Sequence, residues 1–178
     1  MTADRCATVL LRAARAVDSQ LDVHDAWVLI VGDTIRAVGS GPDAPAPPLV
    51  IDLGDAILVP GFIDLHGHGG AGGAFDDGPD AIRTALAMHR QHGTIRSVLS
   101  LVANPIDALT ASLAAIRTVM ADDPLVLGAH LEGPFLSAHN RGAHEPQFLI
   151  DPTRETIDVL LDAAGGVLRQ ITVAPELP

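Results

Sequence analysis

From residue 58 onward the sequence alternates between strand-like and helix-like segments, and this alternation constrains the fold more than any other feature. Strands separated by single helices predict right-handed βαβ crossovers and a parallel sheet, because a parallel neighbour is reached only by a long return connection. In chain order, the expected strands and the helices between them are 58–66, 78–93, 94–102, 104–123, 125–133, 151–166 and 168–176.

The number of strand–helix units limits the architecture further. A complete (β/α)8 barrel takes roughly 250 residues, and this chain of 178 residues reaches only a fourth strand. Residues 58–178 therefore predict an α/β fold that corresponds to the first four β/α units of a barrel, or about half of it. Residues 1–57 differ, since they contain short β-like runs, among them two strands joined by a tight turn at Gly32-Asp33.

Composition and charge exclude several classes of partner. The formal net charge is −11, which disfavours nucleic acid and anionic membranes because both attract basic surfaces. No apolar run is long enough to span a bilayer, and the N-terminus has no signal-like core. A lone cysteine, Cys6, forms no internal disulfide, so we expect a cytoplasmic protein. The chain has no lysine, so this segment offers no carboxylated-lysine metal bridge.

The stretch "FIDLHGHGGAG" at the end of the first expected barrel strand has two incompatible interpretations. Glycines at 67, 69 and 72 match the G-x-G-x-x-G pattern of dinucleotide-binding proteins. In those proteins the third glycine opens a helix, and an acidic residue follows about 20 positions later. Here the turn-forming "GAFDDGPD" follows Gly72, and the next strand ends near 102–104 without an acidic residue. The pattern therefore disfavours a nucleotide site.

His66 and His68 favour a metal site instead. Residues i and i+2 of a strand project to the same face, and at the carboxyl end of a barrel strand that face opens into the active-site mouth. Neutral imidazoles suit Zn²⁺ or Fe²⁺. The alternative is a pair of surface histidines in a glycine-rich loop. Asp64 shares the same face, and we expect it to support the site without binding the metal.

A second group of polar residues follows the third expected barrel strand. Glu132 ends the apolar run "LVLGAHL" and would reach the same level as the two histidines, unless it is merely a solvated loop carboxylate. His130 lies deeper on the same face, and we expect it in the core or behind a ligand. Arg141 and His144 lie in the next loop, where they would meet an anionic or carbonyl group or simply solvent. Surface positions are expected for His24, His89, His92 and His139.

Four motifs together resemble one family. "PGFIDLHGHG", "HLEGPFLS", "GAHEP" and "ITVAPE" resemble the N-acetylglucosamine-6-phosphate deacetylases of the amidohydrolase superfamily. The H-x-H pair is shared across that superfamily, whereas "HLEGPF" followed by "GAH-x-P" is more specific to this deacetylase. The resemblance runs along the whole chain, including the β-rich first part.

The resemblance implies a fold, an activity and a set of roles. Such enzymes combine a metal-bearing (β/α)8 barrel with a small β-sandwich, are homodimers, and release acetate from a small sugar-phosphate substrate in amino-sugar catabolism. By motif position, Glu132 is a metal ligand, Ala143 and His144 contact substrate, and His66 and His68 match members that can hold a second metal. The resemblance thus implies one or two divalent ions, Zn²⁺ or Fe²⁺.

The resemblance also implies what this segment lacks. The family's catalytic aspartate and two further metal histidines belong to later strands, beyond Pro178, so no catalytic residue is expected within 1–178 and the isolated segment is expected to be inactive. Two alternatives stay open at this point. One is another amidohydrolase, such as a dihydroorotase-like cyclic amidase, and the other is a non-catalytic truncated remnant.

Overall fold

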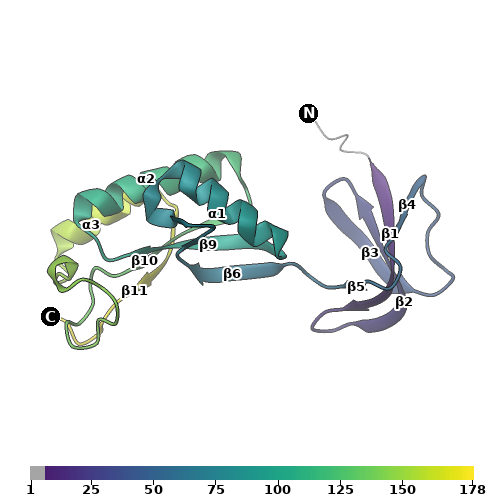
Figure 1. Cartoon of the computed structure of the whole chain (residues 1–178), viewed down its shortest axis with the longest axis horizontal. Helices are drawn as coiled ribbons and strands as arrows, with labels where there is room; N and C mark the ends of the chain where they lie inside the picture. Colours follow the sequence, from purple (N-terminus) through teal and green to yellow (C-terminus); the bar gives the residue numbers. More distant parts are fainter. Residues whose placement is uncertain (1–6) are drawn as a thin grey trace. The chain divides into compact units, whose positions relative to one another are not determined.

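The computed structural model describes residues 7–178, so Cys6 lies outside the described residues. The chain divides into two compact units, Met1–Pro60 and Gly61–Pro178. Figure 1 shows a β-rich N-terminal unit and an α/β C-terminal unit. Within residues 7–178, no helix is both long and apolar enough to cross a membrane.

The N-terminal unit is built around one sheet. Its strands are β1 (Thr8–Val17), β2 (Asp22–Val31), β3 (Thr34–Ser40), β4 (Leu49–Asp52) and β5 (Ile57–Leu58). The order is β3-β2-β1-β4, with β5 also paired to β1. β2 and β3 form the expected hairpin, whose turn contains Gly32 at φ 63°, a conformation that glycine adopts without strain.

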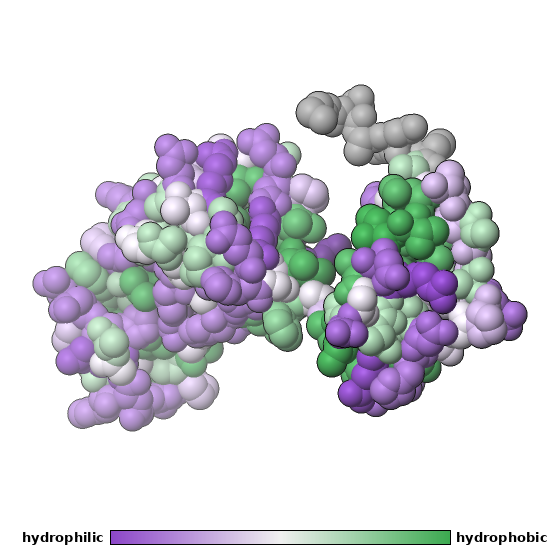
Figure 2. Space-filling model, turned by 45° about the vertical axis from the view of Figure 1, so that its right-hand side comes forward, coloured by the Kyte–Doolittle hydropathy of each residue, from purple (hydrophilic) through white to green (hydrophobic). Residues whose placement is uncertain are grey.

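Apolar side chains remain at the surface of this N-terminal sheet. Figure 2 shows hydrophobic residues gathered on the unit that lies at the right of the view. Ile35 and Ile57 are more than half exposed, and a shallow cavity of about 230 Å³ is lined by Leu11, Val28 and Ile30. In a β-sandwich, a face of this kind packs against a second sheet.

The C-terminal unit is a parallel sheet with helices along one face (Figure 1). Its strands β6 (Phe62–Gly67), β9 (Thr94–Val102), β10 (Val126–Glu132) and β11 (Leu168–Thr172) lie in the order β11-β10-β9-β6. All three pairings are parallel. The connecting helices are α1 (Pro79–Gln91), α2 (Ile106–Asp122) and α3 (Arg154–Ala164). This confirms the α/β class, since four parallel strands are connected by three helices, as in the first part of a barrel.

Local sequence signals explain where the helices begin and end. Pro79 occupies the first turn of α1, where its missing N–H costs no hydrogen bond. The Thr153 hydroxyl accepts a hydrogen bond from the Thr156 N–H at 3.2 Å and so caps α3. Gly165 ends α3 in the left-handed conformation. The core between helices and sheet includes Leu109, Leu113, Ile116, Leu99, Leu101 and Leu131, all at most 1% exposed.

The first barrel strand differs from expectation. A continuous strand over 58–66 was expected, but the chain is divided at Pro60: β5 pairs with β1, whereas β6 pairs with β9. Proline has no N–H for a strand ladder, which explains the break. β6 lies at an edge of the described sheet, and Phe62 and Leu65 are 63% and 57% exposed. Its apolar run therefore did not indicate burial within these residues.

Candidate metal centre

His66 and His68 converge at the carboxyl end of β6. His66 is the penultimate residue of the strand, and His68 is the first residue after it. Their Nε2 atoms are 3.2 Å apart, and the rings are in an edge-to-face arrangement with centroids 5.1 Å apart. Both side chains keep solvent access, at 49% and 39% exposure. The Asp64 carboxylate accepts a hydrogen bond from the His66 N–H at 3.1 Å, so it braces the backbone beneath the pair.

The glycines that follow serve packing and not phosphate binding. They form a short hairpin of β7 (Gly69–Gly70) and β8 (Gly73–Ala74), followed by the 3-10 turn η1 (Phe75–Asp77). A Cβ at Gly69 would overlap the Gly73 carbonyl oxygen, and one at Gly70 would overlap the Met88 side chain on α1. No helix begins at Gly72, since α1 starts at Pro79. The structure thus agrees with the rejection of a nucleotide site.

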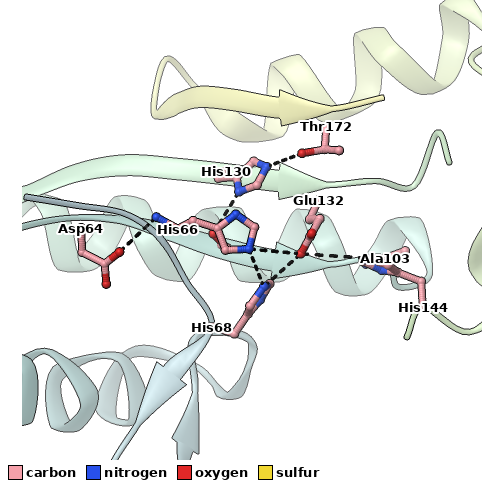
Figure 3. A network of polar contacts seen from close by, with 9 residues as sticks. Asp64, His66, His68, Ala103, His130, Glu132, His144 and Thr172 are labelled. Atoms are coloured by element: carbon pink, nitrogen blue, oxygen red, sulfur yellow. Dashed lines mark hydrogen bonds and ion pairs between the residues drawn. The ribbon is translucent and has the colours of Figure 1, made fainter. Parts of the chain in front are cut away.

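Glu132 reaches the two histidines from the end of β10. Its Oε2 lies 2.9 Å from His68 Nε2 and 3.7 Å from His66 Nε2, and the side chain is 24% exposed. Figure 3 shows the carboxylate and both imidazoles pointing toward one another from the carboxyl ends of β10 and β6, the two strands on either side of β9. Glu132 is therefore not a solvated loop carboxylate.

The three donor atoms match the requirements of a single ion. In the part of the chain that the structure describes, one group of at least three His, Cys, Asp or Glu side chains has its donor atoms within 4.8 Å of one another, and it is His66, His68 and Glu132. Ligand atoms at about 2.0–2.2 Å from a tetrahedral ion lie roughly 3.3–3.6 Å apart. The observed separations of 2.9, 3.2 and 3.7 Å bracket that range, so the residues fit such an ion.

His130 lies beside this cluster but is fully occupied by protein partners. It is completely buried. Its Nδ1 contacts the Ser100 hydroxyl at 2.9 Å, and its Nε2 contacts the Thr172 hydroxyl at 2.8 Å. Burial lowers the pKa of His130, and the nearby His66 lowers it further. The ring lies 5.1 Å from the His66 ring, so His130 is a neutral core residue that packs behind a candidate ligand.

His144 is held in place by the backbone of the neighbouring strand end. The Ala103 N–H donates to His144 Nδ1 at 3.2 Å, and the side chain is only 10% exposed. A neutral imidazole that accepts at Nδ1 carries its proton on Nε2. That Nε2 lies 3.9 Å from Glu132 Oε2. The Arg141 guanidinium donates to the His144 carbonyl oxygen, so it organises this loop.

A pocket with several polar side chains opens beside the donor cluster, two of whose members, His68 and Glu132, line it. It has a volume of about 530 Å³, within the usual size range for small-molecule sites. Its lining includes the polar side chains of His68, Glu132, Asn140, Arg141 and His144, together with Ala143. A second cavity of about 430 Å³ beside α3 and β11 is lined only by apolar residues and proline. It offers no group for acid–base or metal chemistry, and the polar pocket is the better candidate site.

Two residues near the cluster were not recognised from the sequence. His89 was expected at the surface, but it is partly buried and its Nε2 contacts the Gly69 carbonyl oxygen at 2.9 Å. Asp76 follows the hairpin; burial raises its pKa, whereas attraction to His68 opposes that rise. The sequence separation of these residues from His66 and His68 matches no known motif. Their position depends on the β7–β8 hairpin, which Asp76 follows and His89 contacts. His24, His92 and His139 are exposed, as expected.

Curated relatives support the family resemblance. No family model matches the chain. It is 33% identical over 174 residues to an N-acetylgalactosamine-6-phosphate deacetylase from Escherichia coli O157:H7, covering 95% of this chain and 45% of that protein. It is 30% identical over 170 residues to the N-acetylglucosamine-6-phosphate deacetylase of Vibrio furnissii, covering 93% and 42%. The chain thus spans less than half the length of these curated relatives.

Solved structures agree with these relatives. A mutant N-acetyl-D-glucosamine-6-phosphate deacetylase from Mycobacterium smegmatis, in complex with N-acetyl-D-glucosamine-6-phosphate, matches with a TM-score of 0.87 and 38% identity over 96% of this chain and 44% of that one. The chain corresponds to the N-terminal portion of the N-acetylglucosamine-6-phosphate deacetylases. A triazine hydrolase variant, at 20% identity and a TM-score of 0.63 over 92% of this chain and 46% of that one, shows the shared fold alone.

Proposed function

We propose that the longer protein to which this chain corresponds hydrolyses the acetamide of N-acetylglucosamine 6-phosphate. One water is consumed, the amide C–N bond breaks, and glucosamine 6-phosphate and acetate are released. The observation that carries the proposal is the convergence of His66 Nε2, His68 Nε2 and Glu132 Oε2 at 2.9–3.7 Å beside a polar pocket. The deacetylase relatives supply the substrate class.

We assign His66, His68 and Glu132 as ligands of one divalent ion, with Zn²⁺ or Fe²⁺ as the preferred metals. Two imidazoles and one carboxylate form a donor set that both ions accept. When bound, such an ion acts as a Lewis acid that polarises an amide carbonyl. An atrazine chlorohydrolase mutant of the same fold was solved with zinc. A second ion would need ligands from outside this chain's cluster of three.

His144 and Ala143 are proposed to contact the substrate. Because the Ala103 N–H fixes the tautomer of His144, its Nε2–H is available as a donor toward the pocket. An acetamide carbonyl oxygen is a suitable acceptor. Ala143 lines the same pocket. The Arg141 guanidinium donates to the loop carbonyl of His144, and it is proposed to shape the pocket.

The configuration of the sugar at C4 gives a second candidate substrate. Among the curated relatives, proteins from Escherichia coli and Shewanella are N-acetylgalactosamine-6-phosphate deacetylases. Both epimers share the acetamide and the phosphate, so the donor cluster serves either one. A comparison of kcat/KM for the two sugar phosphates decides between them.

We also propose that the longer protein is a cytoplasmic homodimer. This rests on the resemblance to the deacetylase family. Light scattering of the purified longer protein tests the oligomeric state, and cell fractionation tests the compartment.

The test of function compares this chain with the longer protein. Acetate release from N-acetylglucosamine 6-phosphate is expected from the longer protein with added Zn²⁺ or Fe²⁺ and is expected to vanish in its Glu132→Ala variant. The 178-residue chain alone is expected to be inactive, since it supplies three metal-ligand atoms but no residue that we assign as a general acid or base. Turnover by the chain alone would contradict this assignment. Hydrolysis of a cyclic amide instead, or metal binding without turnover by the longer protein, would favour the alternative functions.

A further inference from the structure

Beneath His68 lies a buried polar arrangement that the proposed ligand set does not use. Among residues 7–178, three buried side-chain atoms have no hydrogen-bond partner, and two of them are His68 Nδ1 and Asp76 Oδ1. Unpaired buried polar atoms are rare because each costs free energy. Here one unpaired atom is an imidazole nitrogen, which can donate a hydrogen bond, and the other is a carboxylate oxygen, which can accept one. The two therefore call for a common explanation.

The backbone brings these two side chains to the same place. The Phe75 N–H donates to the His68 carbonyl oxygen at 3.0 Å, and Asp76 is the next residue. The Asp77 carboxylate accepts a hydrogen bond from the Ala74 N–H at 2.9 Å, which fixes the start of η1. Asp76 is close enough to His68 for the two side chains to interact electrostatically.

Metal binding through Nε2 places the imidazole proton on Nδ1. Metal-bound histidines almost always donate that proton to a carboxylate, a carbonyl or water. His68 presents its Nε2 to Glu132 and His66, so its Nδ1 is the atom that needs an acceptor. Asp76 is a carboxylate on the same loop with an oxygen to spare.

We propose that Asp76 accepts the Nδ1–H of His68 and positions this imidazole for the divalent ion. The two atoms are not hydrogen bonded in this structure, so fixing Nε2 at an ion is expected to turn the ring onto the carboxylate. The inference rests on the proposed metal centre and adds a positioning residue to it. His89, which contacts the Gly69 carbonyl oxygen at 2.9 Å, holds the other side of the same loop.

The first experiment measures Zn²⁺ affinity of the 178-residue chain by competition with a chromophoric chelator. Asp76→Asn is expected to weaken binding about 10- to 100-fold, the usual effect of removing the partner of a metal-bound histidine. Asp80→Asn is the matched control, since its exposed carboxylate pairs with Arg83, and it is expected to stay within about twofold of wild type. Asp76→Glu retains a carboxylate and is expected to recover part of the affinity.

The second experiment reads the hydrogen bond directly. In the Zn²⁺-loaded wild-type chain with ¹⁵N-labelled histidine, His68 is expected to show a slowly exchanging Nδ1–H resonance that Asp76→Asn removes or shifts. Circular dichroism of the apo variants shows whether they are folded, and the wild-type resonance tests the proposal even if Asp76→Asn does not fold.

The outcomes separate the two claims. A wild-type chain that binds no Zn²⁺ overturns the metal centre and the role of Asp76 together. A wild-type chain that binds Zn²⁺ without a protected Nδ1–H, or a folded Asp76→Asn chain that binds as tightly as wild type, overturns the role of Asp76 alone.

Discussion

Two histidine environments lie next to each other on the same parallel sheet and differ in how their ring nitrogens are satisfied (Figure 3). His130 on β10 is fully buried, and hydroxyl groups of Ser100 and Thr172 contact both its nitrogens. His66, whose ring centroid is 5.1 Å away, directs Nε2 toward His68 and Glu132. The chemistry available to each imidazole is therefore set by the atoms around it, more than by its place on the sheet.

The contrast separates a structural role from a binding role. An imidazole whose nitrogens are both hydrogen bonded to hydroxyls stabilises the fold and is unavailable as a ligand. An imidazole that is partly exposed to solvent and faces two other potential metal-ligand atoms gains little stability from them. It is therefore available to bind an ion. Changes in the binding environment should therefore alter metal affinity, and changes in the buried environment should alter the free energy of unfolding.

The largest effect is expected from Glu132→Ala. Four-ligand structural zinc sites bind with about 10–16 kcal/mol, so one ligand corresponds to roughly 3–4 kcal/mol, or a loss of a few hundred-fold in Zn²⁺ affinity. Isothermal titration of the 178-residue chain measures this. Glu155→Ala, an exposed position in the first turn of α3, is the matched control. Equal affinities for wild type and Glu132→Ala would remove Glu132 from the centre.

The next effect is expected from His130→Ala, which should lower the free energy of unfolding by about 2–3 kcal/mol. The substitution leaves a cavity and removes the partner of two hydroxyl groups, and both changes are destabilising. Urea denaturation of the apo chain measures the loss. His139→Ala, at an exposed loop position, should be close to neutral. Wild-type stability in His130→Ala would show that the buried environment is not structural.

The smallest effect is a pH dependence. Burial lowers the pKa of His130 below its ordinary value of 6.5, so in acid the unfolded chain takes up this proton more readily than the folded chain. The stabilising contribution of neutral His130 is present above pH 6.5 and is lost as the pH falls toward the lower folded-state pKa. The stability difference between wild type and His130→Ala should therefore shrink between pH 7.5 and pH 5. A constant difference over that range would contradict the lowered pKa.

The same comparison shows how far the sequence alone leads. Strand periodicity placed His66, His68 and Glu132 at one level, and the helix expected at 104–123 is found at 106–122. Periodicity assigns a residue to a face, but it does not say which residue of the next strand lies opposite. His130 was expected in the core and is buried there, but its pairing with Ser100 depends on the register between β9 and β10, and so its hydroxyl partners could not be predicted.

The positions of Asp76 and His89 near the His68 loop could not be predicted for a different reason. Asp76 follows a hairpin of two-residue strands, and His89 contacts the Gly69 carbonyl oxygen of that hairpin. The hairpin is too short to produce a recognisable pattern. The apolar run around 58–66 misled for a related reason, since its composition indicates strand but does not distinguish an edge from a centre. Pro60 was the available signal that the run is divided.

The most direct test of the account is a crystal structure of the Zn²⁺-soaked chain with anomalous data at the zinc edge. One strong anomalous peak is expected about 2.0–2.2 Å from His66 Nε2, His68 Nε2 and Glu132 Oε2. A peak elsewhere, or none at saturating zinc while the three side chains keep their positions, would contradict it.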